Sequence, residues 1–179
     1  MRVFIAINFP TPVRRALVKH QQTIRDAAQS GNFTHEENLH LTLVFLGEVP
    51  VGDLVRINAI VEAVACRGFS LAFDEIGRFD RKGKDIWWVG IRRNKSLLDL
   101  QAALGDEFRR AGYRLDSRPF TAHITLAREV RMSDPGDRRR LCTAIAPIET
   151  GVTRVSVMES TRVDGRLTYR EVYGKDFPA

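Results

Sequence analysis

The pattern His-x-Thr-Leu occurs twice in this chain, at His40-Leu41-Thr42-Leu43 and at His123-Ile124-Thr125-Leu126, 83 residues apart. Each copy lies in a run of apolar and β-branched residues, a pattern typical of a buried strand. For a chain of this composition, chance produces two such copies less than about once in ten thousand. The repeat therefore predicts an internal duplication, and it restricts the fold to architectures built from two similar halves.

The segments around the two motifs follow a similar order of strands and helices. We expect an α+β fold in which two facing antiparallel sheets form two lobes, with helices on the outside and a central cleft. The chain is expected to be a single domain, residues 1–179, with pseudo-repeats over about 1–80 and 84–175. The expected strands are 2–8, 39–46, 69–76, 86–91, 120–126, 152–158 and 167–173, and the expected helices are about 11–29, 54–64, 96–112 and 137–146.

Cap and turn residues mark several of these boundaries. Thr11 before Pro12 predicts the N-cap of the first helix, and Ser96 with Asp99 predicts a capping box for the third. Asp164-Gly165 predicts a hairpin turn between the last two strands.

The chain carries 28 Lys and Arg against 22 Asp and Glu, a net charge of +6 with a pI near 9.8. Most of the basic residues are arginine, whose planar fork matches phosphate, so we expect a phosphate-rich partner; an Arg-biased genome is the alternative explanation. The longest apolar runs have only four or five residues, which excludes a membrane-spanning helix. Because the N-terminus shows no export signal, we expect a cytoplasmic location. A monomer is the default expectation for the oligomeric state.

Cys66 and Cys142 are the only cysteines, and neither belongs to a C-x-x-C or C-x-x-H pair. They cannot form a disulfide framework, and they give no support to a zinc or redox site. Both are expected to be buried, inert thiols within helices.

The two motifs predict acid–base chemistry. Residues i and i+2 of a strand share a face, so His40 and Thr42 point one way together, as do His123 and Thr125. Two imidazoles can supply a proton acceptor and a proton donor near neutral pH, and threonine hydroxyls can donate to phosphate oxygens. A single copy would more simply be a core histidine beside a strand-favouring threonine. Two copies favour in-line attack on phosphorus without a metal or other cofactor.

Three segments carry a resemblance to a known family: 2–7, 37–49 and 118–128, the last two containing Glu37-Asn38-Leu39-His40 and Arg118-Pro119-Phe120-Thr121-Ala122-His123. The chain resembles the 2H phosphoesterases, and among them the RNA 2′,3′-cyclic phosphodiesterases, also called 2′-5′ RNA ligases. Glu36 and Ala122 stand where such proteins usually carry proline, which should loosen the backbone slightly.

The resemblance implies a metal-independent enzyme that hydrolyses an RNA or nucleotide 2′,3′-cyclic phosphate to a 2′-phosphomonoester. His40 would donate a proton to the leaving 3′-oxygen and His123 would accept one from water, an assignment that the pseudo-symmetric residues alone leave open. Thr42, Thr125 and Arg128 would bind substrate, and the reverse reaction would join RNA ends. The alternative is a non-catalytic RNA-binding member of the same fold.

Two substrate contacts are harder to predict. Strict alternation points Arg128 away from the site, so it reaches phosphate only if the strand ends or bulges after Leu126; otherwise it is a solvated arginine. A base-stacking residue is sought among five aromatic side chains, of which we favour Phe4: Phe4, Phe9, Trp87, Trp88 and Tyr169.

Overall fold

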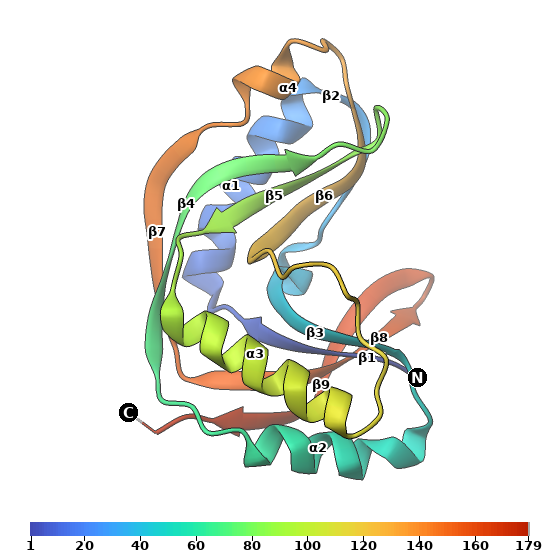
Figure 1. The fold of residues 1–179 in the computed structure, drawn as a ribbon. Coiled ribbons are helices and arrows are strands. Elements are labelled where there is room, and N and C mark those ends of the chain that lie inside the picture. The colour runs from blue at the N-terminus through green and yellow to red at the C-terminus, as the bar shows by residue number, and fades with distance from the viewer. Residues whose placement is uncertain (179) are drawn as a thin grey trace.

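The computed structural model describes residues 1–178 (Figure 1). The helices are α1 (Thr11–Ala27), α2 (Leu54–Ala63), α3 (Lys95–Arg110) and the single turn α4 (Asp137–Arg140), with short 3-10 turns η1 (Glu36–Asn38) and η2 (Val51–Asp53). The strands are β1 (Arg2–Asn8), β2 (Ala28–Phe33), β3 (His40–Glu48), β4 (Phe69–Phe79), β5 (Asp85–Ile91), β6 (His123–Met132), β7 (Ala144–Val152), β8 (Arg154–Val163) and β9 (Arg166–Asp176).

The strands form two antiparallel sheets, which confirms the predicted α+β fold. One has the order β3-β1-β8-β9 and the other the order β2-β6-β5-β4-β7. The four strands of the first sheet correspond to β6-β5-β4-β7 of the second, and β2 is an addition at the edge. The correspondence extends to the register, because Asn8 of β1 lies opposite His40 and Gly90 of β5 lies opposite His123.

Each sheet takes strands from both halves of the sequence. The first sheet contains β1 and β3 together with β8 and β9, whereas β4 pairs with β5 and β7 in the second sheet. The chain therefore crosses to the second sheet for β2, returns for β3, and crosses again after α2 and after β7; these last two crossings are at the left of Figure 1.

The helices cover the outer faces of the sheets. α1 packs on β2, β6 and β7, α3 packs on β3, and α2 packs on β8 and β9. The contact stripe of α1 and that of α3 repeat every three to four residues, which is the amphipathic spacing of the sequence. These stripes are buried: Val13, Leu17, Gln21 and Ile24 in α1, and Leu97, Leu100, Leu104, Gly105 and Phe108 in α3. No helix within residues 1–178 is long and apolar enough to cross a membrane.

Two edge strands depart from the prediction. The predicted helix over 137–146 is wrong beyond Arg140, because residues from Ala144 onward pair with β4 as the edge strand β7. Pro147 fits that edge position, since it has no N–H to donate to a neighbour. The first helix ends at Ala27, and the polar segment after it pairs with β6 as the edge strand β2.

The predicted caps and thiols also need correction. Helix α1 begins at Thr11 itself with Pro10 as its cap, and the Asn94 side chain, rather than Ser96, accepts the Leu97 N–H at 3.0 Å to cap α3. Cys66 is half-buried and Cys142 is exposed, so the prediction of a buried thiol is wrong for Cys142. Both cysteines lie in connecting segments, outside α2 and α4.

Candidate active site

His40 is the first residue of β3, directly after η1 and Leu39. Its Nδ1 lies 2.7 Å from the backbone oxygen of Asn38. Because a carbonyl oxygen can only accept, Nδ1 carries the hydrogen and Nε2 is the nitrogen available for chemistry. In this neutral form Nε2 accepts from the Thr42 hydroxyl, with Nε2 and Oγ1 3.0 Å apart.

A backbone carbonyl two residues earlier also orients the imidazole of His123. His123 opens β6, rather than lying within a strand that begins at Phe120, and its Nδ1 lies 2.7 Å from the backbone oxygen of Thr121. Nε2 is again the nitrogen left for chemistry. Unlike Nε2 of His40, it makes no hydrogen bond with any group in residues 1–178, although Thr125 lies two residues further along β6.

Different aromatic rings flank the two imidazoles. His40 lies 4.8 Å from Phe4 and 5.0 Å from Tyr169 between ring centroids. The ring centroid of His123 lies 5.0 Å from that of Phe79 and 6.3 Å from that of Trp88. A Cβ at Gly77 would overlap the Trp88 ring, so this glycine gives the ring its place beside His123.

The five aromatic candidates separate into core and site residues. Phe9 and Trp87 are buried in the core, and Phe4 is only 3% exposed beneath His40, which leaves little surface on which a base could stack. Trp88 and Tyr169 are half-buried and lie beside His123 and His40. Phe79 was missed by the sequence analysis, since it closes a strand with no motif around it.

The surroundings lower the pKa of both histidines. Burial lowers the pKa of His40 to about 4, and repulsion by Arg128 and His123 adds to this, while the hydrogen bond to the Asn38 carbonyl opposes it. Burial and repulsion by Arg128 also lower the pKa of His123, against the hydrogen bond to the Thr121 carbonyl. Both imidazoles are therefore neutral at pH 7 in the ligand-free protein, and they face a fixed positive charge.

Arg128 reaches the histidines because β6 bulges. Between Thr125 and Ala127 this strand has one residue more than β5 has between Trp88 and Trp87, so that Leu126 and Ala127 are both buried. This bulge breaks the alternation that would otherwise direct Arg128 away from the site. A second extra residue lies between Ala127 and Val130, where Glu129 adopts a left-handed conformation with φ of 54°. The guanidinium acts on the pKa of His40, His123 and Tyr169, so it lies within electrostatic range of both motifs.

Asn38 is a further site residue that the sequence analysis did not single out. Its side chain is 6% exposed; Nδ2 donates to the Leu167 carbonyl at 2.9 Å, and Oδ1 accepts the Tyr169 N–H at 3.3 Å. Since its own carbonyl accepts from His40, Asn38 joins β9 to the imidazole. Its place in the segment Glu37-Asn38-Leu39-His40 was the available signal.

No three His, Cys, Asp or Glu side chains within residues 1–178 gather closely enough to hold a metal ion. The chemistry that the site offers comes from two imidazole Nε2 atoms, two threonine hydroxyls and one guanidinium. This set can accept one proton, donate another and stabilise negative oxygens.

Known proteins are similar to this chain in sequence and in fold. The chain is 33% identical over 129 residues to an RNA 2′,3′-cyclic phosphodiesterase of Geobacillus stearothermophilus, covering 70% of this chain and 41% of that protein. A protein of the same description from Thermotoga maritima is 29% identical, with 99% of this chain and 96% of the relative covered. The crystal structure of Escherichia coli LigT with 3′-AMP superposes with a TM-score of 0.81 at 26% identity, over 98% of this chain and 97% of LigT.

The model of the 2′-5′ RNA ligase superfamily matches residues 11–164, a span that contains both motifs and the Arg128 bulge. With most of the sequence inside that match, the chain belongs to the 2′-5′ RNA ligase superfamily, the group of 2H phosphoesterases to which its paired His-x-Thr motifs pointed.

Proposed function

We propose that this protein hydrolyses the 2′,3′-cyclic phosphate of an RNA end or a nucleotide to a 2′-phosphomonoester. The observation that carries the proposal is a pair of imidazoles in the same tautomer at the starts of equivalent strands, His40 of β3 and His123 of β6. The relatives in G. stearothermophilus and T. maritima, described as RNA 2′,3′-cyclic phosphodiesterases, support this substrate class.

The reaction is an in-line displacement at phosphorus. A neutral Nε2 takes a proton from water while the water oxygen bonds to phosphorus, and a protonated Nε2 gives its proton to the 3′-oxygen as the P–O3′ bond breaks. The phosphate stays on the 2′-oxygen. The two imidazoles end with exchanged protonation states, so a proton returns through solvent before the next turnover.

We assign the donor role to His40 and the acceptor role to His123. Since the pKa of His40 is about 4 in the ligand-free protein, the donor gains its proton only when the anionic phosphodiester binds beside it. A protonated Nε2 no longer accepts from Thr42, and the freed hydroxyl donates to a non-bridging oxygen. Thr125 and Arg128 stabilise the remaining charge on the phosphoryl group.

The test is turnover of a nucleoside 2′,3′-cyclic phosphate in excess EDTA, with the product identified as the 2′- or 3′-phosphate by chromatography. We expect sustained release of the 2′-phosphate. His20→Ala, which removes a half-buried histidine of α1, is the matched control and should keep its activity. Activity that EDTA abolishes and only a divalent ion restores would overturn the metal-free mechanism, and absence of turnover under all conditions would leave a binding protein.

A further inference from the structure

The face of the second sheet that carries His123 also carries an unpaired carboxylate, that of Glu75. Residues that lie opposite each other in an antiparallel sheet share a face. Glu75 of β4 lies opposite Gly90 of β5, and Gly90 in turn lies opposite His123 of β6. Glu75 is exposed, and its carboxylate forms no hydrogen bond or ion pair within residues 1–178.

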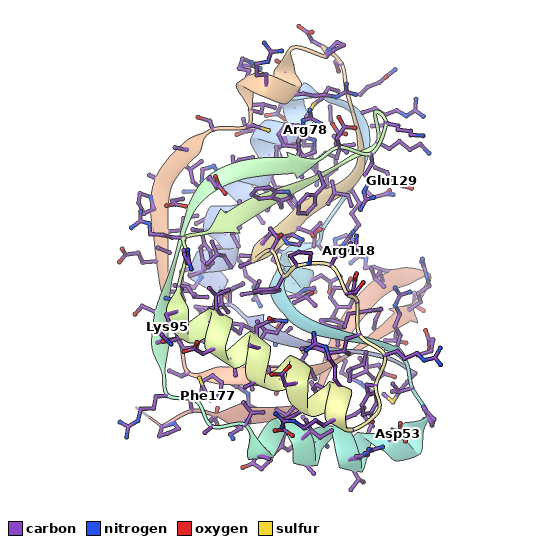
Figure 2. The ribbon with its side chains drawn as sticks, viewed as in Figure 1. Asp53, Arg78, Lys95, Arg118, Glu129 and Phe177 are labelled. Atoms are coloured by element: carbon purple, nitrogen blue, oxygen red, sulfur yellow. The ribbon has the colours of Figure 1, made fainter. Side chains whose placement is uncertain are left out.

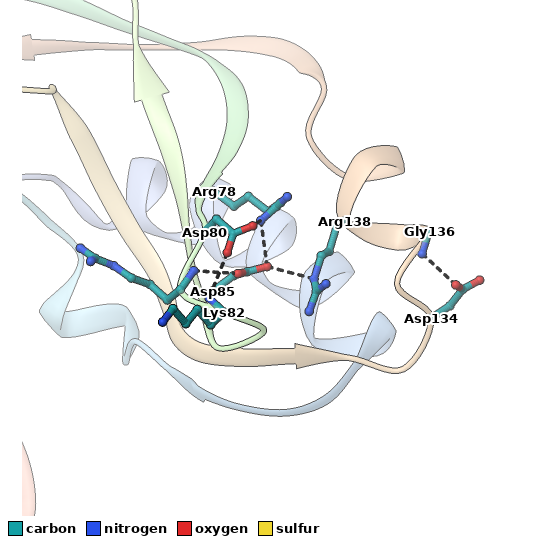
Figure 3. A network of polar contacts seen from close by, with 8 residues as sticks. Arg78, Asp80, Lys82, Asp85, Asp134, Gly136 and Arg138 are labelled. Atoms are coloured by element: carbon teal, nitrogen blue, oxygen red, sulfur yellow. Dashed lines mark hydrogen bonds and ion pairs between the residues drawn. The ribbon is translucent and has the colours of Figure 1, made fainter.

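The other carboxylates of the β4–β5 hairpin all have partners. Asp74 accepts from Nε of Arg92 at 2.9 Å. Arg78 lies toward the far end of the hairpin (Figure 2). There it forms ion pairs with both Asp80 and Asp85, at 3.1 and 3.2 Å (Figure 3). The unpaired carboxylate is therefore an exception within its own hairpin, and the paired ones fix the strands that carry it.

A glycine allows the Glu75 carboxylate to lie over β5. A Cβ at Gly90 would be 2.6 Å from Oε1 of Glu75 and 3.0 Å from Cζ3 of Trp88. The carboxylate and the edge of the indole ring thus adjoin the same point on this face of the sheet. In the other half-site the equivalent position is Asn8, whose Nδ2 donates to Ser156 at 3.0 Å, so a side chain of the protein occupies that place.

The Trp88 ring lies flat on the same face. A Cβ at Gly77 would overlap three atoms of its six-membered ring, so one face of the ring covers this glycine. The Phe79 ring centroid lies 5.4 Å away with the two planes tilted by 41°, which is not a parallel stack. The outer face of the half-buried indole is therefore open to a planar ligand such as a nucleobase.

A carboxylate beside a stacking ring selects for hydrogen-bond donors. It can only accept, and it repels an anionic phosphate bound nearby. In a nucleoside 2′,3′-cyclic phosphate both ring hydroxyls are esterified, so the base is the remaining source of paired donors. Guanine presents two adjacent donors, N1–H and N2–H, which one carboxylate can accept together. In adenine, cytosine and uracil the donor has an acceptor beside it, which a carboxylate repels.

We propose that Glu75 and Trp88 form a base subsite that prefers guanine, so that the enzyme favours an RNA end or nucleotide whose cyclic phosphate is on guanosine. Trp88 stacks on the base, and Glu75 accepts hydrogen bonds from N1–H and N2–H. This preference rests on the proposed function and specifies its substrate.

The experiment compares the 2′,3′-cyclic phosphates of guanosine, inosine, adenosine, cytidine and uridine. Inosine differs from guanosine only in lacking the 2-amino group. We expect kcat/KM to be at least about tenfold higher for guanosine than for inosine, the usual effect of losing one hydrogen bond to a charged group. The other three substrates should be no better than inosine. In Glu75→Ala the guanosine-to-inosine ratio should fall to within about twofold of one, because both acceptors are gone.

The matched control is Glu149→Ala, which removes an exposed glutamate from the edge strand β7 and should keep the ratio of the unaltered protein. Using a ratio cancels any change in phosphate affinity that follows from the lost negative charge. Equal kcat/KM for guanosine and inosine in the unaltered protein, or a ratio that Glu75→Ala leaves unchanged, would overturn the proposal.

A second variant tests the stacking surface. Trp88→Leu should raise the KM of all five substrates by roughly tenfold, because stacking on an indole depends little on which base is stacked. A KM that stays unchanged would place the base on another surface and refute the subsite. If this variant does not fold, the Glu75→Ala ratio still decides.

Equilibrium binding separates this inference from the proposed reaction. By calorimetry, guanosine 2′-phosphate should bind at least about tenfold more tightly than inosine 2′-phosphate to the unaltered protein, and about equally to Glu75→Ala. A guanine preference in binding without any turnover would support the subsite and refute the reaction. Turnover of all five substrates without a guanine preference would support the reaction and refute the subsite.

Discussion

The His40 and His123 half-sites share a backbone and differ in nearly everything around it. In both, a histidine opens a strand and donates Nδ1–H to a carbonyl two residues earlier at 2.7 Å. His40 is held at Nε2 by Thr42 and joined through Asn38 to β9, whereas Nε2 of His123 has no such contact within residues 1–178. The two half-sites therefore share the geometry of the imidazoles but not their surroundings. In the ligand-free protein the pKa of His40, the assigned proton donor, is lowered to about 4, so the bound anionic phosphodiester has to raise that pKa before His40 can give a proton.

Removing either imidazole is the strongest test of this comparison. His40→Ala and His123→Ala should each lower kcat by about 10²–10⁴-fold, because each deletes one of the two proton transfers. The double variant should be little worse than either single one, since the groups act as a unit. Steady-state hydrolysis of a cyclic nucleotide measures the effect. If one single variant keeps most of its activity, the two half-sites do not cooperate.

A substrate with a very good leaving group sharpens the assignment of roles. Protonation of the departing oxygen then matters little, so the His40→Ala variant should regain about 10²-fold in rate and His123→Ala should regain much less. The relative rates of the activated and natural substrates in the two variants provide the measurement. Equal rescue would remove the assignment, and rescue of His123→Ala alone would reverse it.

Acid stability distinguishes the half-sites without catalysis. Above pH 6.5 both folded and unfolded His40 are neutral, and the lowered pKa has no effect on stability. As the pH falls toward 4, the unfolded chain takes up the proton while folded His40, with its pKa of about 4, does not, so stability is lost. The loss is about 2 kcal/mol at pH 5.

His40→Asn should therefore reduce the difference in unfolding free energy between pH 7.5 and pH 5, as measured with urea. His123→Asn should reduce this difference less, because only Arg128 repels a protonated His123, whereas both Arg128 and His123 repel a protonated His40. The same pH difference in both variants as in the unaltered protein would mean that neither imidazole is held neutral by the fold.

The smallest expected effect comes from the residues that supply the two carbonyls. Asn38→Ala keeps the carbonyl but releases Leu167 and Tyr169, which should lower kcat about tenfold and the unfolding free energy by about 1–3 kcal/mol. Thr121→Ala, the matched change in the other half-site, removes an exposed side chain and should change kcat less than about twofold. Comparable losses in the two variants would show that Asn38 has no special role in holding His40.

Local patterns predicted most of the elements around the first motif, whereas β6, which carries the second motif, runs over His123–Met132 rather than over 120–126. The apolar runs gave β1 and β3, and the helical stripes gave α1 and α3, because burial of one face imposes a period that the sequence displays. β2 and β7 escaped prediction because an edge strand needs no alternating apolar face: residues 28–33 are mostly polar and β7 contains proline. Their pairing with β6 and β4 supplies the order that their own residues do not.

For the candidate site, the sequence indicates which residues to consider but not what surrounds them. Two His-x-Thr motifs point to His40 and His123, but the unequal surroundings depend on Phe4, Tyr169 and Phe79, which are distant in sequence. The direction of Arg128 depends on irregular pairing of β6 with β5 between Thr125 and Ala127 and again at the left-handed Glu129, where no glycine or asparagine marks a bulge. Such features follow from tertiary packing, so a local pattern carries no signal for them.

The interleaving of the halves has a consequence for the order in which the protein can be made. On a ribosome, β1 emerges first and can pair with β3, but its other edge stays open until β8 arrives about 150 residues later. That edge belongs to Val3-Phe4-Ile5-Ala6-Ile7, an apolar segment of the kind that recruits foreign strands. The nascent chain thus carries an aggregation-prone edge through most of its synthesis, and the first lobe closes only after both histidines have been translated.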